Sequence, residues 1–313
     1  MSEALEGGAK GAGRGIAIIG LEGSGKTVFL AALAQAMQYT SGYPHLEMAG
    51  ADAVKTRLYV AGLWNVIQLG KWPPSTNMGL MRALSWTWHC APGQSHTVWL
   101  PDCAGQDIRQ IFESGGAGEH QKRLAADIFA SRHVLVLFNL KELIDLHGQP
   151  GVCDRRVNAE TAVCAAIKAL NASGTPFSVL LAQYDAYKAH IATHFGRDIL
   201  AAVKHYSMPL WRALSQCTTE LLPMAAVETE VHFKGRVAER HPVFNANPHA
   251  SVMRVARIIN GRILAGRPRR RRGFWGKETV RAALGALGRG LGVVVREART
   301  AIRQNTGSQT PES

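Results

Sequence analysis

The chain has 313 residues, a net charge of +13 and 46% hydrophobic residues, which is enough apolar sequence for a globular core. It contains no run of 18 apolar residues, so we expect no transmembrane helix, and its five cysteines form no C-x-x-C pair. These features disfavour zinc sites and disulfide frameworks, and they favour a reducing, cytoplasmic location.

The first predicted elements are a strand over residues 15–20 and a helix over residues 26–39. Between them, Gly20–Thr27 reads G-x-x-x-x-G-K-T. A strand delivers such a loop, its glycines let backbone N–H groups approach an anion, and the following helix N-terminus faces that anion. The sequence therefore predicts a phosphate-binding loop and a nucleotide ligand.

The rest of the chain alternates between helical and strand patterns. A tight turn at residues 91–94 predicts that the strands around it form an antiparallel hairpin. The expected elements are a helix over 51–69, a loop at 71–76, strands over 81–90 and 95–100, a helix over 120–131, a strand over 133–138, a helix over 159–171, a strand over 177–182, one or two helices over 186–216, a last strand over 221–227 and a last helix over 251–264. This order predicts an α/β three-layer fold with a mostly parallel sheet, one antiparallel strand and helices on both faces.

Polar residues follow several of these strands, at the sheet edge where ligands bind in such folds. The backbone N–H groups of Gly23–Thr27 would surround a β-phosphate, and the Lys26 ammonium would bridge β- and γ-phosphate oxygens. The Thr27 hydroxyl would ligate Mg²⁺. Asp102 ends a strand, where its carboxylate is either a second Mg²⁺ ligand or a residue that terminates the strand in a turn.

Four further residues are candidates for the site, and three of them also allow a plain structural interpretation. The N–H of Gly105 can reach a γ-phosphate, because glycine lets the backbone come close. The Gln106 amide can orient an attacking water, or it is a surface residue at a helix start. Thr76 can reach the metal when its loop closes, or it is only a loop residue. Asp185 can accept two N–H bonds from a guanine edge, or it caps a helix beginning at Ala186.

In their order and spacing, Gly20–Thr27, Asp102–Gln106 and Gln183–Asp185 resemble the signatures of small P-loop GTPases of the translation-factor-related class. Two segments, Gly23–Leu33 and Lys71–Thr76, are similar in sequence to those of the bacterial double-GTPase-like group. The resemblance covers about residues 15–265 and implies the P-loop NTPase sandwich.

By this resemblance, Thr76 would be the switch I threonine, Asp102–Gln106 would begin switch II, and residues 225–227 would lie in the last base-contacting loop. Lys26 and Gln106 would be the catalytic residues. Thr27, Asp102 and Thr76 would be the Mg²⁺ ligands. The implied GTP-binding residues are Gly20, Gly23, Ser24, Gly25, Lys26, Thr27, Val28, Gly105, Gln183 and Asp185. The implied function is a molecular switch that hydrolyses GTP slowly.

Three departures from the family pattern keep other interpretations open. The guanine motif is normally Asn-Lys-x-Asp, whereas Ala182–Asp185 retains only the aspartate, so ATP remains a candidate beside GTP. Glu22 brings a carboxylate near the γ-phosphate, where like charges would slow hydrolysis. No intrinsic arginine finger is identifiable, since Arg109 reads as a switch-surface residue, and this implies an activating protein. The alternatives are a nucleotide-binding pseudo-switch and an ATP-using kinase or transport accessory.

The domain organisation is read from charge and glycine content. Residues 1–14 read as a flexible N-terminus, residues 15–265 as the GTPase-like domain and residues 266–313 as a basic tail. From Arg267 onward the chain holds eleven Arg or Lys against three Asp or Glu, and residues 277–304 show helical apolar spacing. This tail predicts a protein partner or a peripheral position on an anionic membrane, with nucleic acid as a weaker alternative.

Overall fold

The computed structural model describes residues 15–48, 53–75, 82–102, 104–114, 118–145, 147, 153–217, 219–234, 237–243 and 250–264. The predicted flexible N-terminus, Thr76 and the basic tail lie outside these residues. Among the helices that are described, none is both long and apolar enough to cross a membrane.

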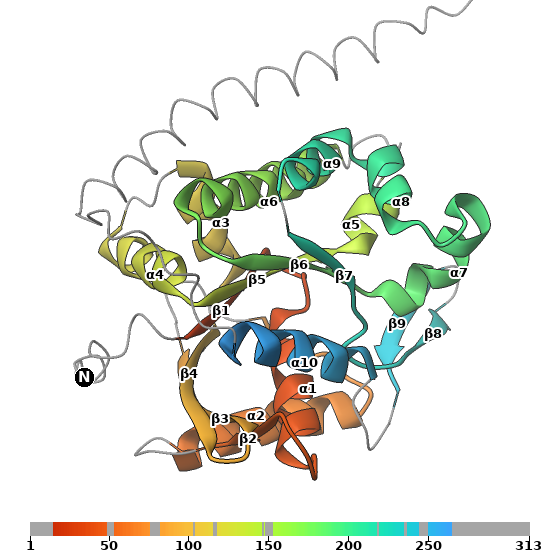
Figure 1. The fold of residues 1–313 in the computed structure, drawn as a ribbon. Coiled ribbons are helices and arrows are strands. Elements are labelled where there is room, and N and C mark those ends of the chain that lie inside the picture. The colour runs from red at the N-terminus through yellow and green to blue at the C-terminus, as the bar shows by residue number, and fades with distance from the viewer. Residues whose placement is uncertain are drawn as a thin grey trace, which may run out of the picture.

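A four-stranded parallel sheet forms the centre of the fold (Figure 1). Its strands run in the order β1 (Ile16–Gly20), β5 (His133–Asn139), β6 (Phe177–Ala182) and β7 (Glu220–Pro223). Every residue of β1, β5 and β6 is buried, because helices cover both faces of the sheet. An uninterrupted apolar run places apolar side chains on both of these buried faces. The model thus confirms the α/β fold with a mostly parallel sheet.

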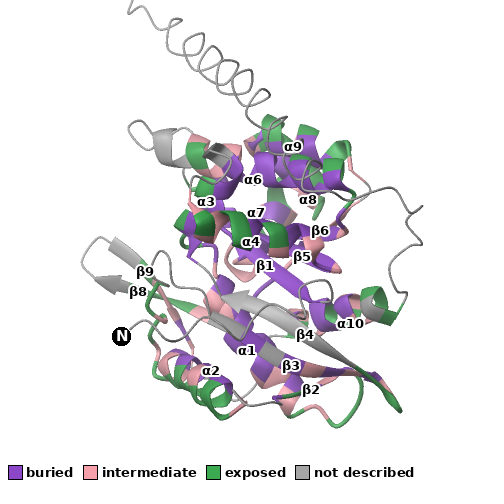
Figure 2. Ribbon diagram, turned by 90° about the vertical axis from the view of Figure 1, so that its left-hand side faces the viewer, coloured by how far each residue is buried: buried purple, intermediate pink, exposed green. Residues whose placement is uncertain are grey.

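Strand β1 divides its side chains between two cores, as the period of two in a strand requires. Ile16 and Ile18 face one core, whose helices are α1 (Lys26–Gln38), α2 (Ala53–Gln68) and α10 (Ala250–Leu264). Ala17 and Ile19 face the other core. Figure 2 shows β1 in the buried colour, between α1 on one side and α4 on the other. The helices of this second core are α3 (Gly105–Ser114), α4 (Glu119–Ala130), α5 (Leu140–Ile144), α6 (Cys153–Ser173), α7 (Tyr184–Phe195), α8 (Ile199–Tyr206) and α9 (Met208–Ser215).

The antiparallel hairpin expected near residue 91 is present as part of a separate sheet. Strands β2 (His45–Glu47), β3 (Arg82–Ala91) and β4 (Gln94–Asp102) pair antiparallel, and β4 packs beside β1. The described central sheet itself is parallel throughout, so the antiparallel strand expected within it lies instead in this second sheet. Trp88 on β3 is fully buried, and its indole Nε1 donates to Oδ1 of Asn260 on α10 at 3.0 Å.

Two features of the C-terminal half differ from the sequence prediction. The strand expected over residues 221–227 is shorter and ends at Pro223, although the N–H of Met224 still donates to the carbonyl oxygen of Leu181 on β6 at 2.9 Å. A hairpin of β8 (Thr229–Lys234) and β9 (Val237–Pro242) follows, although no strand was predicted there. This β8–β9 hairpin lies at the carboxyl edge of the central sheet, beside α7 (Figure 1).

Candidate functional site

The loop between β1 and α1 is built to hold an anion. Gly25 precedes α1 with φ of 86°, a left-handed conformation that glycine adopts without strain. The Lys26 side chain is buried, and its Nζ donates to the carbonyl oxygens of Gly20 at 2.7 Å and Leu21 at 2.9 Å. The lysine therefore curls over the loop with its charge beside the N-terminus of α1, where the helix dipole also favours negative charge.

Glycine is needed at two places where another part of the chain approaches this loop. A Cβ on Gly20 would lie 2.7 Å from the carbonyl oxygen of Leu137 on β5. It would also lie 2.5 Å from Oγ of Ser24 in the loop, a buried hydroxyl with no hydrogen-bond partner among the described residues. A Cβ on Gly105 would lie 2.1 Å from the backbone nitrogen of Glu22. The N-terminus of α3 therefore rests directly on the phosphate loop, and the two helix N-termini flank the same space.

The neighbouring strand also supports the loop. Asn139, the last residue of β5, is buried and donates from Nδ2 to the carbonyl oxygen of Gly23 at 3.0 Å. Its Oδ1 accepts from the backbone N–H of Lys141 at 2.9 Å, which caps α5. No sequence motif marked Asn139, because the bond joins residues that are 116 positions apart.

A second group of residues gathers at the ends of β6 and β7. Gln183 takes a left-handed conformation with φ of 62°, and α7 begins at Tyr184. Asp185 therefore lies inside the first turn of α7, and the alternative that it caps a helix beginning at Ala186 is wrong. Instead, its Oδ2 accepts a hydrogen bond from the hydroxyl of Thr229 at 2.7 Å.

Trp72 joins the loop after α2 to the β8–β9 hairpin. Its indole Nε1 donates to the carbonyl oxygen of Arg240 at 2.8 Å, and the residue stays 40% exposed. The Arg240 guanidinium donates to the carbonyl oxygen of Ala186 at 3.4 Å and lies 6.0 Å from the ring of Tyr187. Burial, followed by a hydrogen bond to Asp145, raises the pKa of Tyr187 far above its usual range, so this phenol stays neutral.

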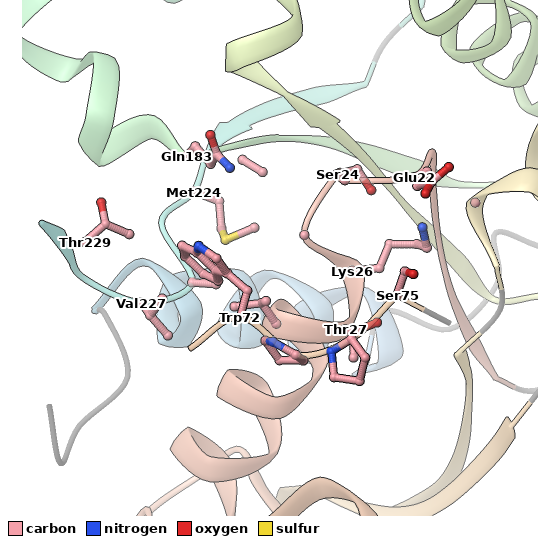
Figure 3. A pocket seen from close by; sticks show the side chains of 18 of the residues that line it. Glu22, Ser24, Lys26, Thr27, Trp72, Ser75, Gln183, Met224, Val227 and Thr229 are labelled. Carbon is pink, nitrogen blue, oxygen red and sulfur yellow. The ribbon is translucent and has the colours of Figure 1, made fainter. Parts of the chain in front are cut away.

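One cavity of about 300 Å³ connects these groups. Figure 3 shows Lys26, Thr27 and Ser75 at one end, and Trp72 and Met224 toward the other. The full lining is Glu22, Gly23, Ser24, Gly25, Lys26, Thr27, Val28, Trp72, Pro73, Pro74, Ser75, Gly105, Ala182, Gln183, Asp185, Met224, Ala226, Val227 and Thr229. The cavity thus has a cationic, N–H-rich end and an end with an apolar wall and one carboxylate, which suits a nucleotide.

The model brings most of the predicted ligand residues to this cavity. Nine of the ten predicted nucleotide-binding residues line it, and the tenth, Gly20, gives its carbonyl to Lys26. Gln106 is exposed and is not part of the lining, and Arg109 is likewise exposed. Trp72, Met224 and Thr229 line the cavity although sequence reasoning assigned them no role.

The predicted metal ligands are only partly described. Thr27 lines the cavity, whereas the Asp102 side chain and the whole of Thr76 lie outside the description. Within the described ranges there is no group of three or more His, Cys, Asp or Glu that could hold a metal ion. Thr27 at the phosphate end is nonetheless the kind of hydroxyl ligand that a nucleotide-bound Mg²⁺ uses, since that ion takes its other ligands from phosphates and water.

One comparison with known protein families agrees with this geometry. The model of the family described as Double-GTPase 1 matches residues 17–160. No curated protein matches the chain in sequence. One similar solved structure is the signal recognition particle receptor SRb-GTP/SRX complex from Chaetomium thermophilum. The match is 12% identical in sequence and covers 68% of this chain and 90% of that chain, with a TM-score of 0.29.

Proposed function

We propose that this chain, a small P-loop GTPase of the double-GTPase type over residues 17–160, binds GTP with Mg²⁺, hydrolyses it slowly and acts as a molecular switch. The main support for this proposal is that one cavity is lined both by Lys26 of the phosphate loop and by the carboxylate of Asp185. A triphosphate needs the first group and a guanine base is recognised by the second.

At the phosphate end, each residue has a distinct task. Lys26 exchanges its bonds to the Gly20 and Leu21 carbonyls for β- and γ-phosphate oxygens. Glycines at 23 and 25 turn the loop so that its N–H groups face the phosphates. When bound, Mg²⁺ would neutralise charge that develops on the β- and γ-phosphates, and we assign it to Thr27, with Asp102 and Thr76 as the other proposed ligands.

At the base end, Asp185 favours guanine by its hydrogen-bonding capacity. An ionised carboxylate only accepts hydrogen bonds. Guanine offers it two neighbouring N–H donors, whereas adenine offers a ring nitrogen that is itself an acceptor. Trp72 and Met224 supply apolar surface for the faces of the base, and a stacked aromatic contributes roughly 1–3 kcal/mol. We therefore assign GTP as the preferred ligand, with ATP as the weaker one.

Two segments of the chain connect the cavity to the surface that would change in a switch. Trp72 at the base end and Ser75 at the phosphate end belong to one loop, which leads into Thr76. Gly105 couples the start of α3 to the phosphate loop. Loss of the γ-phosphate would therefore act on both segments, as in other nucleotide switches that order two loops around this group.

A second candidate function is a pseudo-switch that binds GTP without hydrolysing it. The exposed position of Gln106, outside the cavity, favours this reading. Equilibrium binding and single-turnover hydrolysis of GTP separate the two, using wild type, Lys26→Ala, Gln106→Ala and the exposed control Lys122→Ala. We expect Lys26→Ala to lose Mg-GTP binding, and Gln106→Ala to keep it while turnover falls by about 10²-fold.

Three outcomes of that experiment lead to different conclusions. Wild-type binding without any turnover would select the pseudo-switch. Turnover that Gln106→Ala leaves unchanged would return Gln106 to an ordinary surface role. Tight Mg-GTP binding by Lys26→Ala would remove the phosphate-loop argument, since Lys122→Ala controls for the loss of a surface lysine.

We also propose a partner for the basic tail, residues 266–313, on its sequence alone. Its cations and apolar spacing suit a protein partner or an anionic membrane surface, which would place a cytoplasmic protein peripherally at the membrane. Deleting residues 267–313 should leave GTP affinity intact and abolish sedimentation with vesicles containing phosphatidylserine. Unchanged sedimentation would reject the membrane as the tail's partner. If the protein without residues 267–313 were unfolded, the tail would instead be part of the core.

A further inference from the structure

The Asn139 side chain bridges the phosphate loop and the start of α5. It is 5% exposed, and its amide makes two hydrogen bonds, one in each direction. Nδ2 donates to the carbonyl oxygen of Gly23 at 3.0 Å, and Oδ1 accepts from the N–H of Lys141 at 2.9 Å. An amide carries a donor nitrogen and an acceptor oxygen on one neutral side chain, and no aliphatic residue can make this bridge.

Asn139 lies beside Ala182 on the neighbouring strand. The two residues are direct partners in the parallel register of β5 and β6. Ala182 is the position at which the guanine motif of the resembling GTPases has an asparagine, and its methyl group cannot make hydrogen bonds. The amide that is missing from β6 is therefore present one strand away, at the same height in the sheet.

We propose that Asn139 is a positioning residue of the phosphate site, holding the Gly23 carbonyl away from the anion so that the following N–H groups face it. Gly23 has φ of 74°, and the peptide after it can rotate with little steric resistance. Fixing its carbonyl removes the orientation in which an oxygen would face a phosphate. This inference rests on the proposed nucleotide site and names a group that pre-organises it.

Two variants separate this role from the capping of α5. Serine is a good N-cap, so Asn139→Ser keeps an acceptor for Lys141 but is too short to reach Gly23. Asn139→Asp also keeps the acceptor and loses the donor. Asn171→Ser is the matched control, because Asn171 is exposed near the end of α6, at the opposite edge of the sheet.

The first measurement needs no ligand. Hydrogen–deuterium exchange of the free protein should become faster over residues 21–27 in Asn139→Ser and Asn139→Asp, while exchange over α5 stays as in wild type. Unchanged exchange over residues 21–27 in both variants would overturn the proposal, and it would do so whether or not the protein binds GTP.

The second measurement compares GTP with guanosine, which lacks phosphates, by displacement of a fluorescent GDP analogue. We expect Asn139→Ser to weaken GTP about tenfold, the size of one hydrogen bond, and to leave guanosine affinity unchanged. Equal losses for both ligands would show a general structural role and would overturn the assignment. Absence of GTP binding in wild type and in Asn171→Ser would reject the proposed function, leaving the exchange result to decide the role of Asn139.

Discussion

The hydroxyl of Thr229 donates a 2.7 Å hydrogen bond to Oδ2 of Asp185, which fastens the first residue of β8 to the first turn of α7. Both residues line the base end of the cavity. The bond occupies one lone pair of the carboxylate and fixes its rotamer, so the remaining acceptor sites face a defined direction. The β8–β9 hairpin thereby helps to shape the proposed base site.

Replacing Thr229 should test this contribution. In Thr229→Val the hydroxyl is lost and the shape is nearly kept, so Asp185 gains rotational freedom. We expect the ratio of GTP to ATP affinity to fall about fivefold, or roughly 1 kcal/mol, because the carboxylate stays in place and loses only the hydrogen bond that orients it. Thr229→Ser keeps the hydroxyl and should retain the ratio. An unchanged ratio in Thr229→Val would show that the carboxylate is held by other contacts.

Gly105 should tolerate no side chain. A Cβ there would lie 2.1 Å from the backbone nitrogen of Glu22 and 2.4 Å from the carbonyl carbon of Leu21, so α3 must move off the phosphate loop. We expect Gly105→Ala to lower the free energy of unfolding by about 1–3 kcal/mol, as overpacking does elsewhere. Urea unfolding measures this cost, and GTP should weaken more than GDP.

Gly62 supplies the control for that substitution. It lies in the exposed part of α2, and a Cβ on it would meet nothing within 4 Å. Gly62→Ala should therefore raise the free energy of unfolding by about 1 kcal/mol through helix propensity alone. If both alanine variants behaved alike, the close approach of Gly105 to the loop would be contradicted.

His133 should make stability depend on pH. It is 1% exposed on β5, and its Nε2 lies 3.0 Å from Oγ of Ser178. Burial, and then the charge of Arg262, lowers the pKa of His133 to about 4. Because the unfolded histidine titrates near 6.5, the unfolded state binds more protons between these values. Stability is thus full above about pH 6.5 and decreases as the pH falls toward 4.

The size of this effect follows from the shift. Between pH 6.5 and about pH 4, protonation of His133 in the unfolded state should lower the free energy of unfolding by about 3 kcal/mol. His133→Asn removes the titrating group, so its unfolding free energy should fall less than that of wild type between pH 6.5 and 4. Parallel pH profiles for the two proteins would mean that folding does not lower the pKa of His133.

Local sequence patterns were sufficient for the parts of the fold that depend on neighbouring residues. Apolar runs placed β1, β5 and β6, and the motif at Gly20–Thr27 placed the phosphate loop. The β8–β9 hairpin was missed, although Thr229–Lys234 alternates polar and apolar residues. A short alternating segment of this kind competes with a loop interpretation when no tight turn marks its end.

The missed site residues depend on contacts between distant parts of the chain. Trp72 reaches the carbonyl of Arg240 across 168 positions, and Asn139 reaches Gly23 across 116. No spacing rule connects such pairs before the fold is known. The cap interpretation of Asp185 was wrong because α7 begins at Tyr184, two residues before Ala186, and helix boundaries are the least certain part of a sequence prediction.

A nucleotide site that recognises guanine is tested most directly by equilibrium binding of fluorescent GTP and ATP analogues, with and without Mg²⁺, to wild type and Asp185→Ala. We predict Mg²⁺-dependent binding with a preference for GTP that Asp185→Ala abolishes through the loss of GTP affinity alone. A preference for ATP, or equal affinities that are indifferent to Asp185, would contradict the account.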